Sequence, residues 1–309
     1  MPCKIYEEKM ERFLAIVNPI AGAGKCGKLA AGALGRLREA GLEVEMVETV
    51  MPVDATRIAR QAYAEGRRHF IAVGGDGTAF EIVDGLFPDA LGGERPSLGF
   101  LPLGTGNSFL RDFTDRGIEF AIESLICGRS RPCDVVRLTH RGGMLHFINI
   151  VSMGFAADVC AIANRLFKPL GPASYAMGVL ATVAGLKSYR LPLGFDGGRR
   201  LEAPVTLISF CNSRFTGGAM MMAPEADTAD GQLDVLYVEE MARRELLRIF
   251  PSIFKGTHLR HPKVHALRTR GVEFDLDPEA GCVLVVDGEV LEYTPRRMEV
   301  LPGSLRVWV

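Results

Sequence analysis

The sequence lacks the features of a membrane, secreted or nucleic-acid-binding protein. Its seven cysteines are scattered and form no C-x-x-C pair, so we expect free thiols in a reducing compartment rather than disulfides or a zinc site. The formal net charge is only −1, which gives no general attraction to nucleic acid. The longest uncharged stretch, residues 169–186, contains three glycines and two prolines, which argues against a transmembrane span. With a charged N-terminus that does not resemble a signal peptide, these absences predict a cytoplasmic protein.

The composition is that of an ordinary globular protein. The length of 309 residues, with 48% hydrophobic and 24% charged residues, predicts about two domains, each with its own core. The sequence contains no Gly-x-Ser-x-Gly segment, which disfavours a serine hydrolase.

The first part of the chain alternates predicted strands with predicted helices. Strands are expected at residues 13–17, 44–47, 70–73 and 97–101. Helices are expected up to about residue 40, over 55–65 with Asp54 as N-cap, after Thr78, and from Phe109. This alternation predicts a Rossmann-like parallel sheet covered by helices, in a domain of residues 1–134 to which residues 296–309 return.

The second part, residues 135–295, is predicted to be a β-rich domain. A hairpin is expected from residues 135–140 and 145–151, and the helices are restricted to 173–187 and 242–255. Further strands are expected at residues 205–210, 233–238, 283–286 and 298–301.

Three predicted strands of the first part end in glycine-rich loops. The central loop, Gly74-Gly75-Asp76-Gly77-Thr78, joins an apolar strand to a helix, so bare N–H groups would face an approaching ligand. A tight turn with nothing bound is the alternative for any one such loop. The loop at residues 22–27 has the G-x-G-x-x-G pattern of a dinucleotide site, which keeps a dehydrogenase as an alternative. Phosphate binding is the function that these repeated loops favour.

Seven segments resemble, in order and spacing, the diacylglycerol kinase catalytic-domain family, which includes bacterial lipid kinases and the sphingosine and ceramide kinases. They cover nearly the whole chain: Asn18-Pro19-x-x-Gly22-x-Gly24, residues 74–78, Pro102-Leu103-Gly104-Thr105-Gly106-Asn107, residues 147–155, Gly217-Gly218-x-Met220 with Pro224, residues 230–234, and Asp287-Gly288-Glu289.

The resemblance implies a kinase that uses ATP and Mg²⁺ to phosphorylate a lipid hydroxyl, diacylglycerol-like or sphingoid-like. It implies an α/β nucleotide domain, a β-sandwich lipid domain and a cleft between them as the active site. By matched position the nucleotide-binding residues would be Asn18, Pro19, Gly22, Thr49, Gly74, Gly75, Asp76, Gly77, Thr78, Gly104, Thr105 and Asn107. Glu289 resembles the general base, and Asp230, with the carbonyls of Asp227 and Gln232, resembles a structural Mg²⁺ site.

The residue chemistry agrees with this resemblance. Phosphoryl transfer needs positioning and charge neutralisation, and Asp76 offers Mg²⁺ a hard oxygen ligand. If the chain is extended, Asp287 and Glu289 would lie on one face, although Asp-Gly is also a hairpin-turn signal. One departure affects the expected metal arrangement. The family usually has Asn-Asp after the third loop, where this chain has Asn107-Ser108.

Several alternatives stay open from the sequence. NAD kinase shares Gly-Gly-Asp-Gly, and a catalytically silent lipid- or nucleotide-binding regulator would suit Ser108. The histidines at 258, 261 and 265 are interpreted as a loop rather than a metal site, because Pro262 interrupts any helix that would align them. Nearby basic residues could meet anionic lipid headgroups. We therefore expect a lipid substrate, peripheral contact with the inner membrane face, no nucleic acid partner, and a homodimer as one possible assembly.

Overall fold

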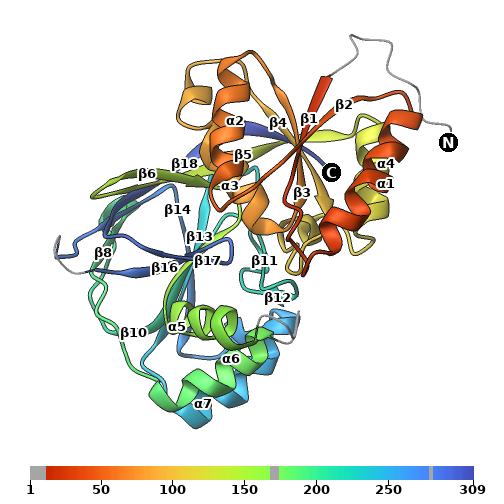
Figure 1. Cartoon of the computed structure of the whole chain (residues 1–309). Helices are drawn as coiled ribbons and strands as arrows, with labels where there is room; N and C mark the ends of the chain where they lie inside the picture. The colour runs from red at the N-terminus through yellow and green to blue at the C-terminus, as the bar shows by residue number, and fades with distance from the viewer. Residues whose placement is uncertain (1–11, 168–173, 278–280) are drawn as a thin grey trace. The chain divides into compact units, whose positions relative to one another are not determined.

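The computed structural model describes residues 12–167, 174–277 and 281–309, which divide into two compact units (Figure 1). Unit 1 comprises the chain up to Cys133 together with Gly303–Val309, and unit 2 comprises Asp134–Pro302. The long strand β18 (Pro295–Trp308) begins in unit 2 and ends in unit 1. Among the described residues, no helix has the length and apolar character needed to cross a bilayer.

Unit 1 is built on a parallel sheet in the order β2-β1-β3-β4, to which the end of β18 adds a further parallel strand. Its strands are β1 (Arg12–Val17), β2 (Glu43–Glu48), β3 (His69–Gly74) and β4 (Ser97–Pro102). Its helices are α1 (Lys25–Glu39), α2 (Asp54–Ala64), α3 (Asp76–Leu86) and α4 (Ile118–Ile126), with short 3-10 turns η1 (Asp89–Leu91) and η2 (Phe109–Asp112).

The strands of unit 1 are apolar on both faces because helices cover both. Helices α1 and α4 pack with alternate strand residues in one core, and the pair α2 and α3 lies on the other side of the strands (Figure 1). Trp308 anchors the returning strand: it is 4% exposed, and its Nε1–H donates to Ser97 Oγ at 2.9 Å. This is the doubly covered parallel sheet that the sequence predicts.

Unit 2 contains a six-stranded antiparallel sheet in the order β14-β13-β10-β7-β16-β17. Its strands are β7 (Ile150–Gly154), β10 (Val205–Cys211), β13 (Leu233–Glu239), β14 (Val264–Thr269), β16 (Val283–Val286) and β17 (Glu289–Glu292). Further strands of the unit are β5 (Ser130–His140), which begins in unit 1, β6 (Gly143–Phe147), β8 (Leu193–Phe195), β9 (Arg200–Leu201), β15 (Gly271–Phe274) and the start of β18. A two-stranded ribbon pairs β11 (Phe215–Thr216) with β12 (Met220–Met221). The fold class, α/β followed by a β-sandwich, is confirmed.

The helical segments of unit 2 lie near the six-stranded sheet. They are α5 (Phe155–Ile162), η3 (Ala163–Phe167), α6 (Ser174–Thr182), η5 (Val183–Gly185), η6 (Asp196–Gly198), α7 (Arg243–Ile249), η7 (Phe250–Lys255) and η8 (Thr257–Arg260). Side chains from α5, α6, α7 and η7 share one apolar core with the sheet.

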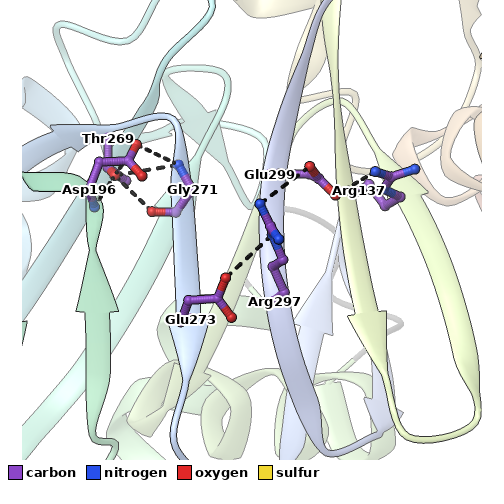
Figure 2. Close-up of polar contacts among 7 residues, drawn as sticks. All are labelled: Arg137, Asp196, Thr269, Gly271, Glu273, Arg297 and Glu299. Carbon is purple, nitrogen blue, oxygen red and sulfur yellow. Dashed lines mark hydrogen bonds and ion pairs between the residues drawn. The ribbon is translucent and has the colours of Figure 1, made fainter.

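Figure 2 shows a row of alternating charges across β5, β18 and β15 in unit 2. Arg137 donates to Glu299, and Arg297 lies 3.8 Å from Glu299 and 3.4 Å from Glu273. In the neighbouring turn, Asp196 accepts N–H bonds from Arg270 at 2.8 Å and Gly271 at 3.1 Å. Arg297 and Glu273 are exposed and Arg137 and Glu299 are half-buried. Cross-strand pairs that remain in contact with solvent contribute little each, so we assign this row to strand register.

Some predicted elements are wrong in detail. Residues 145–151 are not one strand: β6 pairs with β5, and β7 pairs with β10 and β16 in the other sheet. The amide of Asn212 holds the crossover, donating to Ile148 O at 2.7 Å and Asp134 O at 3.1 Å. Because the whole stretch is apolar and buried, periodicity could not reveal the change of sheet.

Four helical segments and one cysteine also differ from the prediction. The segment from Phe109 is only a short 3-10 turn, and 242–255 divides into α7 and η7. In the range 173–187 the helix α6 ends at Thr182, and residue 173 lies outside the described residues. Asp54 lies inside α2 and accepts the N–H of Val50 instead of capping the helix. Cys127 is disulfide-bonded, whereas five other cysteines are outside disulfides, as expected: Cys26, Cys133, Cys160, Cys211 and Cys282.

Candidate active site

Three glycine-containing loops meet at the carboxyl edge of the parallel sheet in unit 1. The N–H of Asn18 donates to Val73 O at 3.0 Å, and the N–H of Gly104 donates to Gly74 O at 2.7 Å. Because β1, β3 and β4 are parallel neighbours, the loops that follow them lie at one edge. Thr49, after β2, joins them through its N–H bond to Val17 O at 2.9 Å.

The glycines allow the main chains of these loops to touch. A Cβ on Gly104 would lie 2.4 Å from Gly75 Cα, and a Cβ on Gly22 would lie 2.5 Å from Leu103 O. Real side chains cannot be accommodated at such distances, so backbone packs against backbone at both positions. Backbone N–H groups in glycine loops are well suited to bind phosphate oxygens.

Thr78 and Thr105 have different surroundings although both lie in the glycine loops. Thr78 is 4% exposed, and its Oγ1 lies 2.4 Å from the position that a Cβ on Gly74 would take. Its side chain therefore closes the turn into α3. Thr105 is exposed, so its hydroxyl is accessible to a ligand.

The carboxylate of Asp76 joins the second loop to the third. Its Oδ2 accepts the N–H of Ser108 at 2.7 Å, and its Oδ1 accepts the N–H of Phe109 at 3.2 Å. Burial raises the pKa of the Asp76 carboxyl above its ordinary value, and these backbone bonds and the Ser108 side chain act in the opposite direction. Because a carboxylate has about four acceptor positions, these three hydrogen bonds leave about one position for a cation.

Asn107 brings a further oxygen to the same place. It has a positive φ of 43°, its Nδ2 donates to Gly104 O at 2.7 Å, and its buried Oδ1 has no hydrogen-bond partner among the described residues. Asp76 and Asn107 both line a cavity of about 20 Å³ between β3, β4 and η2. Carboxylate and amide oxygens are hard ligands, so this donor set fits Mg²⁺.

Glu289 lies in unit 2 at the start of β17. The turn before it has positive φ at Asp287 (49°) and Gly288 (92°), and Val286 pairs with Glu289 across it, so Asp-Gly forms a hairpin turn. The expectation of two carboxylates on one extended face is therefore wrong. Asp287 is 8% exposed and its Oδ1 accepts the N–H of Ile150 at 2.9 Å, whereas Glu289 is exposed.

The surroundings of Glu289 are partly apolar. Burial, and secondarily the charge of Glu289, raise the pKa of the Cys160 thiol to about 12. The Sγ of Cys160 donates to Gly288 O at 3.5 Å. The turn thus has one buried carboxylate that supports structure and one exposed carboxylate that remains available for chemistry.

Comparison with known proteins gives matches along both units. Residues 12–138 match the diacylglycerol kinase catalytic domain, and residues 149–309 match the YegS C-terminal NAD kinase beta sandwich-like domain. A diacylglycerol kinase of Staphylococcus aureus (strain MRSA252) is 30% identical over 90% of this chain and 86% of its own length. The chain belongs to the diacylglycerol kinase family.

Other members of the family match the chain almost end to end. A diacylglycerol kinase of Mycobacterium tuberculosis (strain ATCC 25618 / H37Rv) is 29% identical over 98% of this chain and 97% of its own. A solved structure from Bacillus anthracis str. Sterne is 25% identical, covers 98% of both chains, and has a TM-score of 0.76. Membership makes this protein a kinase that phosphorylates a lipid hydroxyl.

The expected structural metal residues of this diacylglycerol kinase family member lie in the loop before β13. Asp227 and Asp230 are exposed, and each side chain accepts a backbone N–H two residues on, from Ala229 at 3.1 Å and Gln232 at 2.9 Å. The described residues contain no group of three or more His, Cys, Asp or Glu side chains placed to hold a metal. A site made of one carboxylate and two carbonyls, as the resemblance implies, would not form such a group.

Two contacts in these loops, made by Asp134 and Ser108, are not predictable from the sequence. Asp134 is 1% exposed, and its Oδ2 accepts the N–H of Gly231 at 2.6 Å, which anchors the loop before β13 from the other end of unit 2. In the sequence Ser108 is only a departure from the family pattern, whereas in the structure its N–H donates to Asp76 Oδ2. Neither contact is local in sequence, so no spacing pattern could have indicated it.

An apolar cavity of about 70 Å³ lies in unit 2 between its helical segments and the six-stranded sheet. Its lining comes from α5, α6, α7 and η7 on one side and from β10, β13 and β14 on the other, and includes Phe155, Val179, Leu236, Leu246, Ile253 and His258. Cavities of this character receive apolar groups.

Proposed function

We propose that the chain transfers the γ-phosphate of ATP, with Mg²⁺, to the hydroxyl of a diacylglycerol-like lipid. The observation that carries the proposal is the direct backbone contact of the three glycine loops beside the Asp76 carboxylate. Phosphoryl transfer depends on positioning and on charge neutralisation, and this edge of the sheet supplies N–H donors and a hard anionic ligand.

In this proposal the residues of unit 1 hold the nucleotide. The backbone of residues 18–24, 74–78 and 104–107, with Thr49 and Thr105, binds the phosphates and the nucleoside. Asp76 and Asn107 hold Mg²⁺, which when bound neutralises the charge of the phosphate groups. Asp230 and the carbonyls of Asp227 and Gln232 hold a second, structural Mg²⁺ that fixes their loop.

Glu289 is proposed as the general base that accepts the proton of the lipid hydroxyl. It is exposed beside a two-residue turn, and the side chain of Asp287 in that turn accepts the N–H of Ile150 at 2.9 Å. A positioned base contributes about 10²- to 10⁴-fold to the rate of such a step.

The proposal includes peripheral contact with an anionic membrane, at the inner face of the cell membrane. The helical segments of unit 2 expose Leu247 three residues after Arg244 in α7, and Phe254 directly before Lys255. Apolar side chains beside cations are typical of surfaces that insert shallowly among anionic headgroups. Sedimentation with vesicles tests this: we expect binding to phosphatidylglycerol vesicles and loss of binding when Leu247 and Phe254 are both changed to Ser.

Transfer of labelled γ-phosphate from Mg·ATP to diacylglycerol in mixed micelles tests the chemistry. Glu289→Gln should lower kcat at least about a hundredfold, whereas Glu292→Gln, an exposed carboxylate on the same strand, should stay within about twofold. Full turnover in Glu289→Gln would exclude the base assignment.

The same assay separates the alternatives. Label in added NAD but not in lipid would identify an NAD kinase. ATP binding with no transfer to either acceptor would identify a silent regulator. Light scattering on the same sample tests whether the proposed homodimer forms.

A further inference from the structure

Asp287 is a buried carboxylate two residues before the exposed Glu289. Its side chain is 8% exposed, and a carboxylate in such a place needs hydrogen bonds to replace the water that it has lost. Its φ of 49° lies in the left-handed region, which few residues with a side chain adopt. A buried carboxylate in an uncommon backbone conformation, directly beside a proposed base, needs a physical explanation.

Two hydrogen bonds join Asp287 to a single residue at the start of β7. Oδ1 of Asp287 accepts the N–H of Ile150 at 2.9 Å, and the N–H of Asp287 donates to Ile150 O at 3.1 Å. The main chain and the side chain of Asp287 are therefore bound to the same point. A displacement of this main chain or a rotation of this side chain would break one of the two bonds.

The residue that receives these bonds lies inside the six-stranded sheet. Ile150 is 3% exposed and pairs with Cys211 on β10, while its neighbour Val151 pairs with Val286 on β16. The start of β7 thus has a partner strand on each side. Asp287 is tied to the interior of the sheet rather than to a loop.

The other turn residue, Gly288, has a separate contact. Its carbonyl oxygen accepts the Sγ–H of Cys160 in α5 at 3.5 Å. Val286 pairs with Glu289 across the turn, so Glu289 follows directly after these two contacts. The hydrogen bonds to Ile150 and Cys160 hold the turn from two different elements, β7 and α5.

We infer that Asp287 is a positioning residue for Glu289, and that its Oδ1, by accepting the N–H of Ile150, sets where the Glu289 carboxylate meets the lipid hydroxyl. The inference rests on the proposed function in taking Glu289 as the general base. It goes further in assigning a role to Asp287, through its acceptor atom rather than its charge. Proton transfer requires heavy atoms within about 2.6–3.2 Å, so a small displacement of the turn lowers kcat.

Two variants of Asp287 separate the acceptor atom from the charge. Asp287→Ala removes the acceptor, and kcat in the phosphate-transfer assay should fall by about 10- to 100-fold per folded protein, with the KM for ATP unchanged. Asp287→Asn keeps an oxygen at the same place and readily adopts positive φ, so kcat should return to within about threefold of wild type. The folded fraction comes from near-UV circular dichroism.

A double variant separates positioning from a general structural role. In Glu289→Gln the base is already lost, so adding Asp287→Ala should lower kcat further by less than about threefold. A merely structural Asp287 would lower kcat equally in both backgrounds. The matched control is Asp196→Ala, which removes a carboxylate that also accepts main-chain N–H groups, and kcat should stay within about twofold.

Three results would overturn the inference: unchanged kcat in Asp287→Ala, equal loss in Asp287→Ala and Asp287→Asn, or the same loss from Asp287→Ala when Glu289 is already Gln. If Asp287→Ala does not fold, Asp287→Ser replaces it, because its hydroxyl is too short to occupy the position of Oδ1, and its comparison with Asp287→Asn decides.

Failure of the proposed function is seen separately from failure of this inference. Full turnover of Glu289→Gln with Asp287 intact would refute the base assignment itself. An impaired Glu289→Gln together with a fully active Asp287→Ala would refute the positioning role alone.

Discussion

The two candidate sites differ in how much space their atoms leave. At the sheet edge of unit 1, the backbone of Gly104 lies so close to Gly75 that one added carbon would sit 2.4 Å from a main-chain atom. In unit 2, apolar side chains enclose about 70 Å³ of free space. The first arrangement fixes donors for a small, charged group of constant shape. The second leaves room for apolar groups of variable length, so the contrast suits the proposed function, in which one site holds phosphate and the other hydrocarbon.

The largest effect on turnover should come from removing the charge of Asp76 in the glycine-loop site of unit 1. Asp76→Asn keeps the shape but removes the negative charge and places an amide N–H₂ near the N–H groups of Ser108 and Phe109. We expect kcat to fall at least about a thousandfold in the phosphate-transfer assay. The control Asp89→Asn changes an exposed carboxylate in η1 and should leave kcat within about twofold. Retention of turnover in Asp76→Asn would show that the carboxylate is structural.

Gly104→Ala tests whether the tight packing is required. The new methyl group would overlap the backbone of Gly75, which cannot move aside as a side-chain end can. We expect the free energy of unfolding to fall by about 1–3 kcal/mol, with weaker ATP binding, as measured by urea titration and calorimetry. The matched control is Gly92→Ala, because nothing lies within 4 Å of a Cβ placed there. Equal stability of the two variants would show that the close backbone packing at Gly104 matters no more than the open space at Gly92.

The pH dependence of stability probes His258 in the apolar cavity of unit 2. The folded-state pKa of His258 lies below its ordinary value, so under mildly acidic conditions the unfolded chain binds a proton that the folded chain does not. The contribution of His258 is therefore full above about pH 6.5 and is lost as pH falls from there through the folded pKa, with a slope of at most about 1.4 kcal/mol per pH unit. Urea titrations at several pH values should show this slope in wild type and a smaller one in His258→Phe. Identical slopes would place the acid sensitivity elsewhere.

The smallest effect should come from adding a carbon where space exists. Val179 is 2% exposed and lines the cavity, so Val179→Ile adds one methyl group to free volume. We expect the free energy of unfolding to change by less than about 1 kcal/mol, in contrast to the same addition at Gly104. A loss as large as that of Gly104→Ala would show that the cavity is not accessible to added atoms.

The sequence predicted the glycine-loop site of unit 1 better than the apolar cavity of unit 2, for a physical reason. Glycine loops after apolar strands are local patterns, so the meeting of residues 18–24, 74–78 and 102–107 followed from parallel strand order. The apolar cavity depends on contacts between segments distant in sequence, such as Val179 and Val264, which no period reveals. The interpretation of the three histidines as a loop holds only for His261, because His265 lies in β14 and His258 lies buried in η8.

The same limit applies to single contacts. The Asp-Gly pair at 287–288 was readable as a hairpin signal, but the burial of Asp287 against Ile150 was not. The change of sheet between β6 and β7 is not visible in the sequence because the segments on both sides are apolar. Long-range hydrogen bonds such as that of Asn212 decide these points, and a single sequence does not show them.

The course of β18 has a consequence for how the protein is made. Unit 1 needs residues 303–309 to cover the edge of β4, yet about 170 residues of unit 2 are synthesised between that edge and its partner. During synthesis one edge of the apolar strand β4 therefore stays unpaired until unit 2 and the residues after it have emerged from the ribosome. Closure of the sheet by Trp308 on Ser97 becomes a late step of biosynthesis, and a chaperone that shields strand edges would act in that interval.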